Sequence, residues 1–593
     1  MSTSNVVSTS SIGSRVPPLT ALAPAIRLGV VGGVIVVLIA LQGMVQAFNQ
    51  RHVISDVVTM SQALLFISIF ICAYLAVSRS GSRSMLAAAT GALCGVVSSL
   101  LMVALLWIGS LVRLGEVFIN ATAELYELLT FGQGLASGSL YWLALGLGIG
   151  LAATFICLLP SNWRRATIQA FIGVVAFGLL QDLIRVTFSE WDLLAPVFKF
   201  LYLANGLTVG GAAALFLVIG GISLLRTTQG SRIRSGWTSL PATGQSTLRW
   251  AVIAAAVVIL LLLPRLLGLY ISEVLDNVGL YLLMGLGLNI VVGFAGLLDL
   301  GYVAFYAIGA YTVGVLTSPE FSTGVIHNWW LALPPAVACA VLAGVVLGIP
   351  VLKMRGDYLA IVTLGFGEII RLLALSDFLK PYIGGAQGIQ GIPSPNLGPL
   401  QINWTPQEFY YLFLGGCLLV AFVAIRMKNS RLGRAWMAVR EDEDVAQAMG
   451  INLVATKLMA FGMGASFGGL SGAIFAAKLA SAYPHSFNFL VSVNVLSLII
   501  IGGMGSIPGV IIGALFLVGL PELLREVGDY RYLFYGAVLV TMMLMRPEGL
   551  WPEKVHRREL HEGLPESIPM PEVAAQEPGP VPAVQGHGSD RGA

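Results

Sequence analysis

The sequence predicts an all-α integral membrane protein, a polytopic helical bundle of about 16 hydrophobic segments with both termini in the cytoplasm. Of the 593 residues, 56% are hydrophobic and only 11% are Asp, Glu, Lys or Arg, whereas about 25% of a soluble domain is charged. Apolar stretches of about 20 residues, the length that a helix needs to cross a bilayer, recur from Leu28 to Met545. One buried core cannot absorb this much apolar surface, so lipid must be the solvent for much of it.

Composition and spacing argue against several other classes. A net charge of +3, with the basic residues distributed among loops, does not fit nucleic-acid binding. No C-x-x-C or H-E-x-x-H motif occurs, so we expect no metal site and no cofactor. All five cysteines lie inside apolar stretches, which is typical of small buried hydrophobes and not of a disulfide framework: Cys72, Cys94, Cys157, Cys339 and Cys417.

The chain is expected to have five parts. Residues 1–27 form a cytoplasmic N-terminal segment, and the apolar run that follows lacks a cleavage pattern, which indicates an uncleaved first span. The other four parts are an N-terminal extension of about six transmembrane helices (28–225), a polar linker (226–249), a second membrane block of about ten segments (250–546) and a disordered cytoplasmic tail (547–593).

The expected spans have the following bounds. In the extension they are 28–47, 57–77, 85–112, 137–159, 167–186 and 204–225. In the second block they are 250–272, 277–297, 301–317, 329–352, 358–375, 408–425, 456–479, 488–503, 508–524 and 531–546. The segments near Gly301 and Gly502 are short and rich in glycine, so we expect re-entrant or interrupted helices there.

The distribution of Lys and Arg supports a single topology in which the loops between all these spans lie alternately on the outer and the cytoplasmic side of the membrane. Basic residues near span ends are retained on the cytoplasmic side. If the N-terminus lies in the cytoplasm, the loops on the cytoplasmic side hold most of the basic residues. Examples are Arg164 with Arg165, and the stretch 426–434 with four basic residues. The alternate loops hold few, such as Lys199 and Lys380. The pattern therefore predicts both termini inside.

The inner loop 426–456 is the most informative polar segment. The acidic residues Glu441, Asp442, Glu443 and Asp444 precede a short helical run, Val445 to Met449, and negative charge at a helix N-terminus is favourable. Gly450 follows where a left-handed C-cap requires glycine. Val445 and Met449 share a face at i, i+4, and Ala446 and Ala448 keep the surface small. Such a helix suits docking into a partner's groove, although a solvated loop whose charges only fix topology has the same features.

Four segments resemble one transporter family. AVREDEDVAQAMGINLVATKLMAF (438–461) looks like the ATPase-coupling loop of ABC importer permeases, in the form found in the branched-chain amino-acid permeases of the LivM/LivH family. NIVVGFAGLLDLGYVAFYAIGAY (289–311), KMRGDYLAIVTLGFGEIIRLL with IGGAQGIQGIP (353–393) and GGMGSIPGVIIG (502–513) follow the order found in LivM-type chains. The resemblance covers about Val274 to Pro552 and leaves the first 248 residues without an assigned role.

The resemblance implies a permease subunit in the bacterial cytoplasmic (inner) membrane that imports branched-chain amino acids. Its implied partners are ATP-binding cassette subunits, contacting residues 441–450, a LivH-like second permease, and a periplasmic amino-acid-binding protein. The outer loop 377–407 would face that binding protein through Gly384, Gly385, Gln387 and Gly388. An equally open alternative is that this segment is only a flexible loop. The chain has no Gly-Lys dipeptide and hence no Walker A loop, so it lacks its own ATPase site.

Charged and polar residues inside the spans are candidates for the translocation path. Glu368 and Arg371 lie at i, i+3 in the span 358–375, and could meet both charges of a zwitterion or form an internal ion pair that locks two helices together. Asn289 and Asp299 flank a glycine-rich stretch where unwound backbone could bind ligand groups, or where small residues only let helices pack closely.

Alternative functions remain open at this stage. Related permeases would carry urea, short amides or other amino acids. An ion-coupled secondary transporter would need midplane carboxylates or a histidine relay, yet all six histidines lie in loops or the tail and only Glu368 is a good carboxylate candidate. A membrane enzyme would need clustered His, Asp or Cys, which the sequence does not offer.

Overall fold

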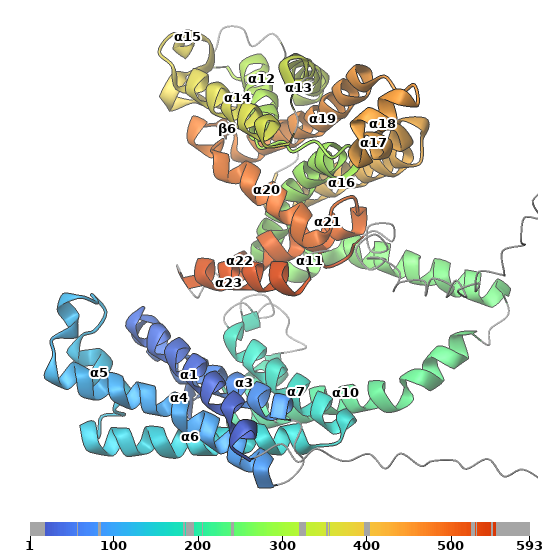
Figure 1. Cartoon of the computed structure of the whole chain (residues 1–593). Coiled ribbons are helices and arrows are strands. Elements are labelled where there is room, and N and C mark those ends of the chain that lie inside the picture. Colours follow the sequence, from blue (N-terminus) through green and yellow to red (C-terminus); the bar gives the residue numbers. More distant parts are fainter. Residues whose placement is uncertain are drawn as a thin grey trace, which may run out of the picture. The chain divides into compact units, whose positions relative to one another are not determined.

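A computed structural model of the chain describes residues 18–552, apart from 56, 81–84, 182–183, 186–194, 204–205, 239–241, 320–325, 327, 352–353, 355, 397–403, 524–527, 529 and 547–548. Within these residues, 11 helices are long and apolar enough to cross a membrane, and helices dominate the cartoon (Figure 1). The predicted all-α, multi-pass fold is confirmed. Most of the expected N-terminal segment and of the expected tail lies outside the described residues.

The described part forms two compact units, which we treat separately. Unit 1 comprises residues 1–276, 404–411 and 519–536, and unit 2 comprises 277–403, 412–518 and 537–593. In unit 1 the first helices are α1 (Pro18–Leu41), α2 (Met44–Asn49), α3 (Met60–Ser80), α4 (Met85–Leu111), η1 (Leu114–Glu116), α5 (Ala123–Leu129), α6 (Leu135–Leu158) and α7 (Ser161–Leu179).

Small residues lie where the helices of unit 1 cross and allow their backbones to approach closely. A methyl group on Gly95 of α4 would lie 2.0 Å from the carbonyl oxygen of Gly146 on α6. The hydroxyl of Ser98, one turn further along α4, donates to the carbonyl oxygen of Gly29 on α1 at 2.9 Å. Such residues let membrane helices approach closely, so the backbones of α1, α4 and α6 are in near contact.

Four short strands, which the sequence did not predict, close the extension on itself. They are β1 (His52–Ile54), β2 (Val58–Thr59), β3 (Tyr202–Leu203) and β4 (Gly206–Leu207), in the order β2-β1-β4-β3. Ile54 pairs with Leu207, and the Ser55 N–H donates to the Leu207 carbonyl oxygen at 2.8 Å. The segments after α2 and after α9 (Ala195–Leu201) are therefore hydrogen-bonded to each other.

The expected polar linker 226–249 is largely helical where it is described. Helix α10 runs through Val209–Thr238 and helix α11 through Ala242–Leu288. The expected spans 250–272 and 277–297 correspond to two helical parts of α11 that meet at a non-helical residue, Gly268, whose φ is 76°. Because glycine tolerates this conformation, the chain can turn there without a polar loop.

The remaining elements follow in chain order. They are η2 (Asn289–Phe294), α12 (Val303–Thr317), α13 (Trp329–Val351), α14 (Asp357–Leu375), α15 (Lys380–Ile383), η3 (Gly385–Gln387), β5 (Ile389–Gln390), α16 (Pro406–Lys428), α17 (Arg431–Glu441), α18 (Glu443–Ala448), α19 (Leu453–Leu479), β6 (Ser481–Ala482), η4 (Pro484–Ser486), α20 (Phe489–Gly502), α21 (Ile507–Ala514), η5 (Leu515–Gly519), α22 (Leu520–Leu523) and α23 (Tyr530–Met545). Besides the 11 long helices, three shorter apolar helices are described, so the expected count of 16 stays a prediction.

The helix breaks expected near Gly301 and Gly502 are present. Between α11 and α12 the helix widens into the π-helix η2, after which residues 296–301 are not helical. A methyl on Gly301 would meet the Thr363 carbonyl oxygen at 1.9 Å, so this break presses against α14. Helices α20 and α21 form a tight hairpin in which Gly513 lies against the Leu498 carbonyl and Gly509 against that of Gly502.

Loops expected on the same side of the membrane meet in unit 2. At one end, β5 pairs with β6, and the Trp330 indole N–H donates to the Pro395 carbonyl oxygen at 3.0 Å. At the other, the 426–456 segment contacts η2 and the turn after α20. Helix α19 begins beside α18 and ends beside β6, so these two groups of loops lie at its opposite ends (Figure 1), in agreement with the predicted alternation.

Candidate functional site

Helices α17 and α18 form the core of the 426–456 segment, and Asp442 joins them. The Ser430 hydroxyl caps α17 by accepting from the Gly433 N–H at 3.3 Å. Asp442 ends α17 in an extended conformation, and its Oδ1 accepts the N–H groups of Asp444 and Val445 at 2.8 and 3.0 Å. Because this carboxylate satisfies two N–H groups that lack intrahelical partners, it fixes the angle between the helices.

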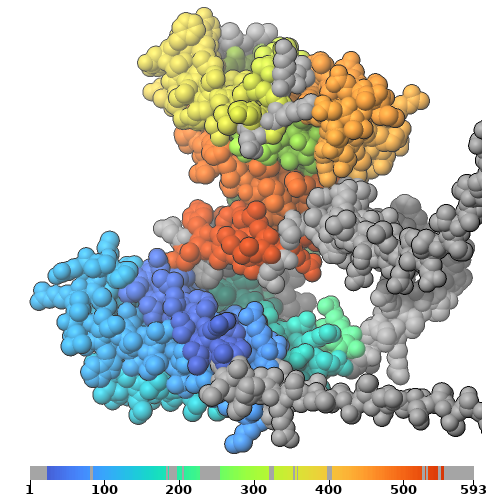
Figure 2. Space-filling view, viewed as in Figure 1, coloured from blue at the N-terminus to red at the C-terminus, as the bar shows by residue number. Residues whose placement is uncertain are grey.

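Helix α18 ends as the sequence predicted, although it begins two residues earlier than expected. Gly450 has a φ of 87°, and the Ile451 N–H donates to the Ala446 carbonyl oxygen at 3.1 Å, which is a Schellman-type end. Ala446 is buried, whereas Val445 and Met449 are 58% and 78% exposed. The predicted apolar face at i, i+4 therefore points away from the unit, and the α17–α18 pair lies at its surface in the orange region of Figure 2.

A buried ion pair attaches α18 to α19. The Lys457 ammonium donates to Glu443 Oε2 at 2.8 Å, and the two side chains are 3% and 19% exposed. In α17, the Trp436 indole N–H donates to the Thr456 carbonyl oxygen at 2.9 Å. The acidic run was predicted to act at the helix N-terminus; the structure adds a partner for Glu443. The signal in the sequence was Lys457, a cation in the second turn of a largely apolar helix.

Two further cations connect this segment to the broken helices. Arg440 of α17 donates from Nη1 to the Gly293 carbonyl oxygen in η2 at 2.8 Å. Lys428, the last residue of α16, donates to the Gly505 carbonyl oxygen at 3.1 Å, and its Nζ lies 5.4 Å from the centre of the Phe294 ring. Neither contact could be predicted from the sequence, because the partners of both cations are backbone groups far along the chain.

Asn289 is engaged by the second broken segment. It is almost fully buried, and its Oδ1 accepts the Gly505 N–H at 2.9 Å. This contact joins η2 to the turn between α20 and α21 across 216 residues of sequence. Its position supports the packing interpretation of Asn289.

Asp299 lies in the non-helical stretch before α12 and is fully buried. Its Oδ1 accepts the Gly301 N–H at 2.9 Å, and its Oδ2 has no hydrogen-bond partner among the described residues. Nearby, the Leu300 N–H donates to the Thr363 hydroxyl at 3.0 Å, and the Val303 N–H donates to the Ser492 hydroxyl at 2.9 Å. A buried carboxyl oxygen without a donor carries a desolvation cost and is therefore a candidate for ligand contact.

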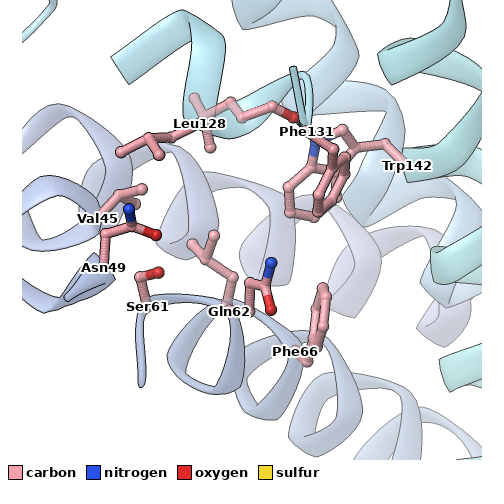
Figure 3. A pocket seen from close by; sticks show the side chains of 10 residues that line it. Val45, Asn49, Ser61, Gln62, Phe66, Leu128, Phe131 and Trp142 are labelled. Atoms are coloured by element: carbon pink, nitrogen blue, oxygen red, sulfur yellow. Dashed lines mark hydrogen bonds between the residues drawn. The ribbon is translucent and has the colours of Figure 1, made fainter. Parts of the chain in front are cut away.

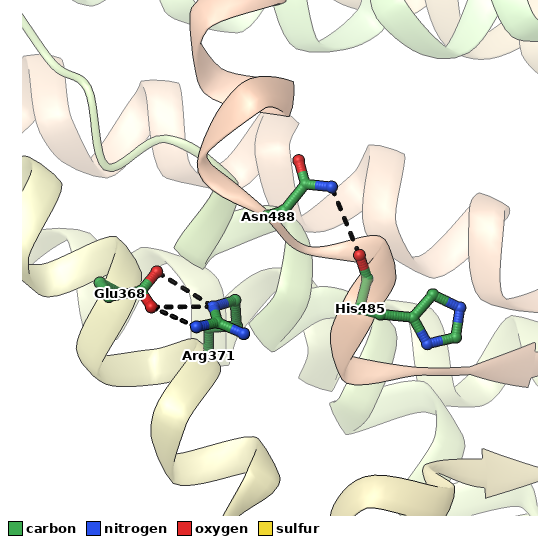
Figure 4. Close-up of polar contacts among 4 residues, drawn as sticks. All are labelled: Glu368, Arg371, His485 and Asn488. Atoms are coloured by element: carbon green, nitrogen blue, oxygen red, sulfur yellow. Dashed lines mark hydrogen bonds and ion pairs between the residues drawn. The ribbon is translucent and has the colours of Figure 1, made fainter.

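Glu368 and Arg371 pair with each other on α14, as their i, i+3 spacing allows. The Arg371 Nε lies 3.0 Å from each carboxylate oxygen, and Nη2 also donates to Oε1. The pair is partly exposed and belongs to one helix, so it does not lock two helices together. In Figure 4 it faces the segment of η4 and α20 that carries His485 and Asn488.

The glycine-rich loop after α14 is ordered by its backbone. Gly384, Gly385 and Gly388 have φ values of 79°, 58° and 67°. A methyl on Gly384 would lie 1.9 Å from the Gly388 carbonyl oxygen, and one on Gly388 would lie 2.3 Å from that of Ala482. The structure thus has tight turns here, held by the β5–β6 pairing, with Gln387 exposed.

Elsewhere in the described part, other candidates are structural. A pocket in unit 1 lies among α2, α3, α5 and α6 (Figure 3). Its polar lining is engaged internally, since Gln62 Oε1 accepts the Thr59 N–H and the Trp142 indole donates to the Leu129 carbonyl oxygen. No group of three or more His, Cys, Asp or Glu that could hold a metal occurs among the described residues.

The fold and this site define a class: a multi-pass helical membrane protein with interrupted helices and a surface helix pair tied to them. A family model, the permease component of branched-chain amino acid transport systems, matches residues 270–543. Escherichia coli LivM, the "high-affinity branched-chain amino acid transport system permease protein", is 40% identical over 347 residues, which cover 55% of this chain and 80% of LivM.

Two more distant relatives agree. A probable LivM of Methanocaldococcus jannaschii is 24% identical (48% of this chain, 94% of the relative), and Escherichia coli LivH is 24% identical (46% and 90%). No solved structure matches the chain significantly. The chain belongs to the family of branched-chain amino acid transport system permease components. It is thus a multi-pass permease subunit of an ABC importer in the bacterial inner membrane, and its permease relatives are transport subunits.

Proposed function

We propose that this chain conducts branched-chain amino acids into the cell and is driven by a separate ATPase subunit that docks on α17 and α18. The observation that carries the proposal is the geometry of α18. Its apolar side chains Val445 and Met449 are exposed, while Ala446 and the ion pair of Glu443 with Lys457 fix its other face. A rigid surface helix with exposed apolar residues suits a groove in a partner protein.

An external ATPase agrees with the sequence, which contains no Gly-Lys dipeptide and so cannot form a Walker A loop. The branched-chain substrate rests on the relatives, whose names state that transport. We extend the proposal to a second, LivH-like permease subunit, since LivH proteins also match this chain. The loop from Gly384 to Gly388 would contact a substrate-binding protein, because its exposed Gln387 sits on turns too tight for larger residues.

For the translocation path, Asp299 is the strongest of the four predicted residues. Its Oδ2 is buried, accepts no hydrogen bond from the described residues and lies at a helix break, where transporters commonly contact their ligands. Glu368 and Arg371 remain candidates for a substrate contact near η4. Because both side chains are partly exposed, a zwitterionic substrate could reach them and replace their ion pair with its own contacts. Asn289 would serve the path indirectly by holding Gly505.

The five-part division of the chain is also retained as a proposal. The family match begins at residue 270, within the second block. We propose that residues 28–225 form a separate extension of the membrane block, whose own hydrogen-bonded strands, β1 to β4, support its integrity.

Docking can be tested by co-purification. Replacing Val445 and Met449 together with Asp should abolish recovery of an ATPase subunit with the tagged full-length chain, because two desolvated charges would face the groove. The matched control, Gln387→Asp, adds a charge at an exposed position at the other end of α19 and should leave recovery unchanged. Equal recovery with both variants would refute docking on α18.

The substrate can be tested separately in liposomes that contain the whole transporter. Unlabelled leucine, isoleucine or valine should compete with radiolabelled leucine for ATP-dependent uptake, whereas urea and acetamide should not. Competition by urea or acetamide alone would assign the transporter to a different substrate class while leaving the docking result intact.

A further inference from the structure

Three side chains converge on the two broken segments of unit 2. The first segment is η2 with the residues up to 296, and the second is the turn Gly503–Ser506 between α20 and α21. The side chains are Arg440, Lys428 and Asn289, and we call them the linkage. They come from α17, from the end of α16 and from η2 itself.

The turn Gly503–Ser506 presents both polar groups of one peptide unit to the linkage. Gly505 has a φ of 79°, which few residues other than glycine adopt. Its N–H donates to Asn289 at 2.9 Å, and its carbonyl oxygen accepts from Lys428 at 3.1 Å. Because Lys428 also lies over the Phe294 ring at 5.4 Å, the turn is bound to η2 through two independent contacts.

Arg440 attaches η2 to the docking helices. Carbonyls at the end of a helix lack intrahelical donors and carry partial negative charge, and Arg440 donates to the one on Gly293 at 2.8 Å. Its aliphatic part packs on Gly296, where a methyl group would lie 2.7 Å from Arg440 Cγ. Gly296 has a φ of 72°, so the backbone is shaped to admit this side chain.

The contacts form one continuous series from the surface to the membrane segments. Helix α18 is capped by Asp442, which also ends α17; α17 carries Arg440; Arg440 binds η2; and η2 binds the turn through Asn289. Just before the turn, the N–H groups of Leu550 and Trp551 donate to the carbonyl oxygens of Ile501 and Gly502 at 2.7 and 2.9 Å. The turn and the residues that precede it are therefore both held by hydrogen bonds.

We infer that Arg440 and Lys428 are positioning residues that transmit movement of the α17–α18 pair to η2 and the Gly503–Ser506 turn. This inference rests on the proposed docking of an ATPase on α18. A charged donor bound to a buried carbonyl is among the stronger hydrogen bonds in proteins, and packed contacts of this kind transmit displacement between discrete arrangements. When the docked pair moves, both broken segments move with it.

The test is the number of leucine molecules imported per ATP hydrolysed by the assembled, full-length transporter in liposomes. Arg440→Gln and Lys428→Met should each keep the ATPase subunit bound and hydrolysis active, and should lower this ratio about tenfold, the size expected for loss of one charge-assisted hydrogen bond. Arg440→Lys should recover part of the ratio, since it restores a cation. The matched control is Arg426→Gln, and it should keep the wild-type ratio, because Arg426 is an exposed arginine of α16 that lies over the Phe422 ring of its own helix.

Two results would overturn the inference. One is a wild-type ratio in both Arg440→Gln and Lys428→Met. The other is loss of the ATPase subunit from these variants, which would place the cations in docking and not in transmission. If the melting temperature shows that Arg440→Gln does not fold, the transport ratio of Lys428→Met tests the inference by itself. If the wild-type chain binds no ATPase at all, the proposed function fails instead, so the two failures are distinguishable.

Discussion

The ion pair between Glu443 and Lys457 gives the sharpest prediction on stability. Glu443→Ala leaves the Lys457 ammonium, only 3% exposed, without its carboxylate, whereas Lys457→Met leaves a carboxylate that is 19% exposed and can regain water. Removing one partner of a fully buried pair costs about 3–5 kcal/mol. Because Glu443 retains some solvent contact, we expect about 2–3 kcal/mol for Glu443→Ala and about 1 kcal/mol for Lys457→Met.

The double variant separates this explanation from simple loss of contacts. With both charges removed, no buried charge is left uncompensated, so the double variant should be more stable locally than Glu443→Ala alone. Glu441→Ala is the control for loss of a surface carboxylate, because Glu441 is exposed and ends α17 two residues before Glu443. It should change the local stability of α18 by no more than about 0.5 kcal/mol.

Hydrogen exchange on the peptide that covers residues 443–449 is the appropriate assay, because it reports local opening of α18. The expected cost of Glu443→Ala corresponds to amide exchange about 30- to 150-fold faster than in the wild type. A peptide from α12 serves as an internal reference. Unchanged exchange in Glu443→Ala, or a double variant that exchanges as fast as Glu443→Ala, would refute the claim that this pair anchors α18.

Three further predictions concern single positions. Asp442→Ala should destabilise α18 by about 1 kcal/mol by loss of its cap, whereas Asp442→Asn should be nearly neutral, and exchange of the same peptide checks both. Gly301→Ala should lower the melting temperature or prevent folding, because its methyl would lie 1.9 Å from the Thr363 carbonyl oxygen. Gly415→Ala should do neither, because no described residue outside its own helical turn lies within 4 Å of the added methyl. Asp299→Asn keeps the size of the side chain and should lower leucine uptake without a fall in melting temperature if its Oδ2 contacts substrate; unchanged uptake would assign it to packing.

Local patterns explain what the sequence could predict. The i, i+4 spacing of Val445 and Met449, followed by Gly450, depends only on neighbouring residues, and α18 has these features. The breaks near Gly301 and Gly502 follow from clustered glycines, which tolerate close contact with backbone. Pairing of Glu368 with Arg371 likewise follows from a spacing of one helical turn.

The contacts between residues far apart in the chain could not be predicted from the sequence. Arg440 meets Gly293 across 147 positions, and Asn289 meets Gly505 across 216. Each partner is a backbone group, which has no signature in the sequence, so packing alone decides which carbonyl or N–H is reached. The break within α11 was expected at residues 273–276 and lies at Gly268, because an apolar pattern does not show at which residue one helix ends and the next begins.

The most direct test of the account is the side of the membrane on which α18 lies. In full-length chains without native cysteines, Met449→Cys should react with a membrane-impermeant thiol reagent in inverted membrane vesicles and not in intact cells. Gln387→Cys, at the opposite end of α19, should show the reverse. Labelling of Met449→Cys from outside intact cells would contradict the account, because no cytosolic ATPase could then reach this helix.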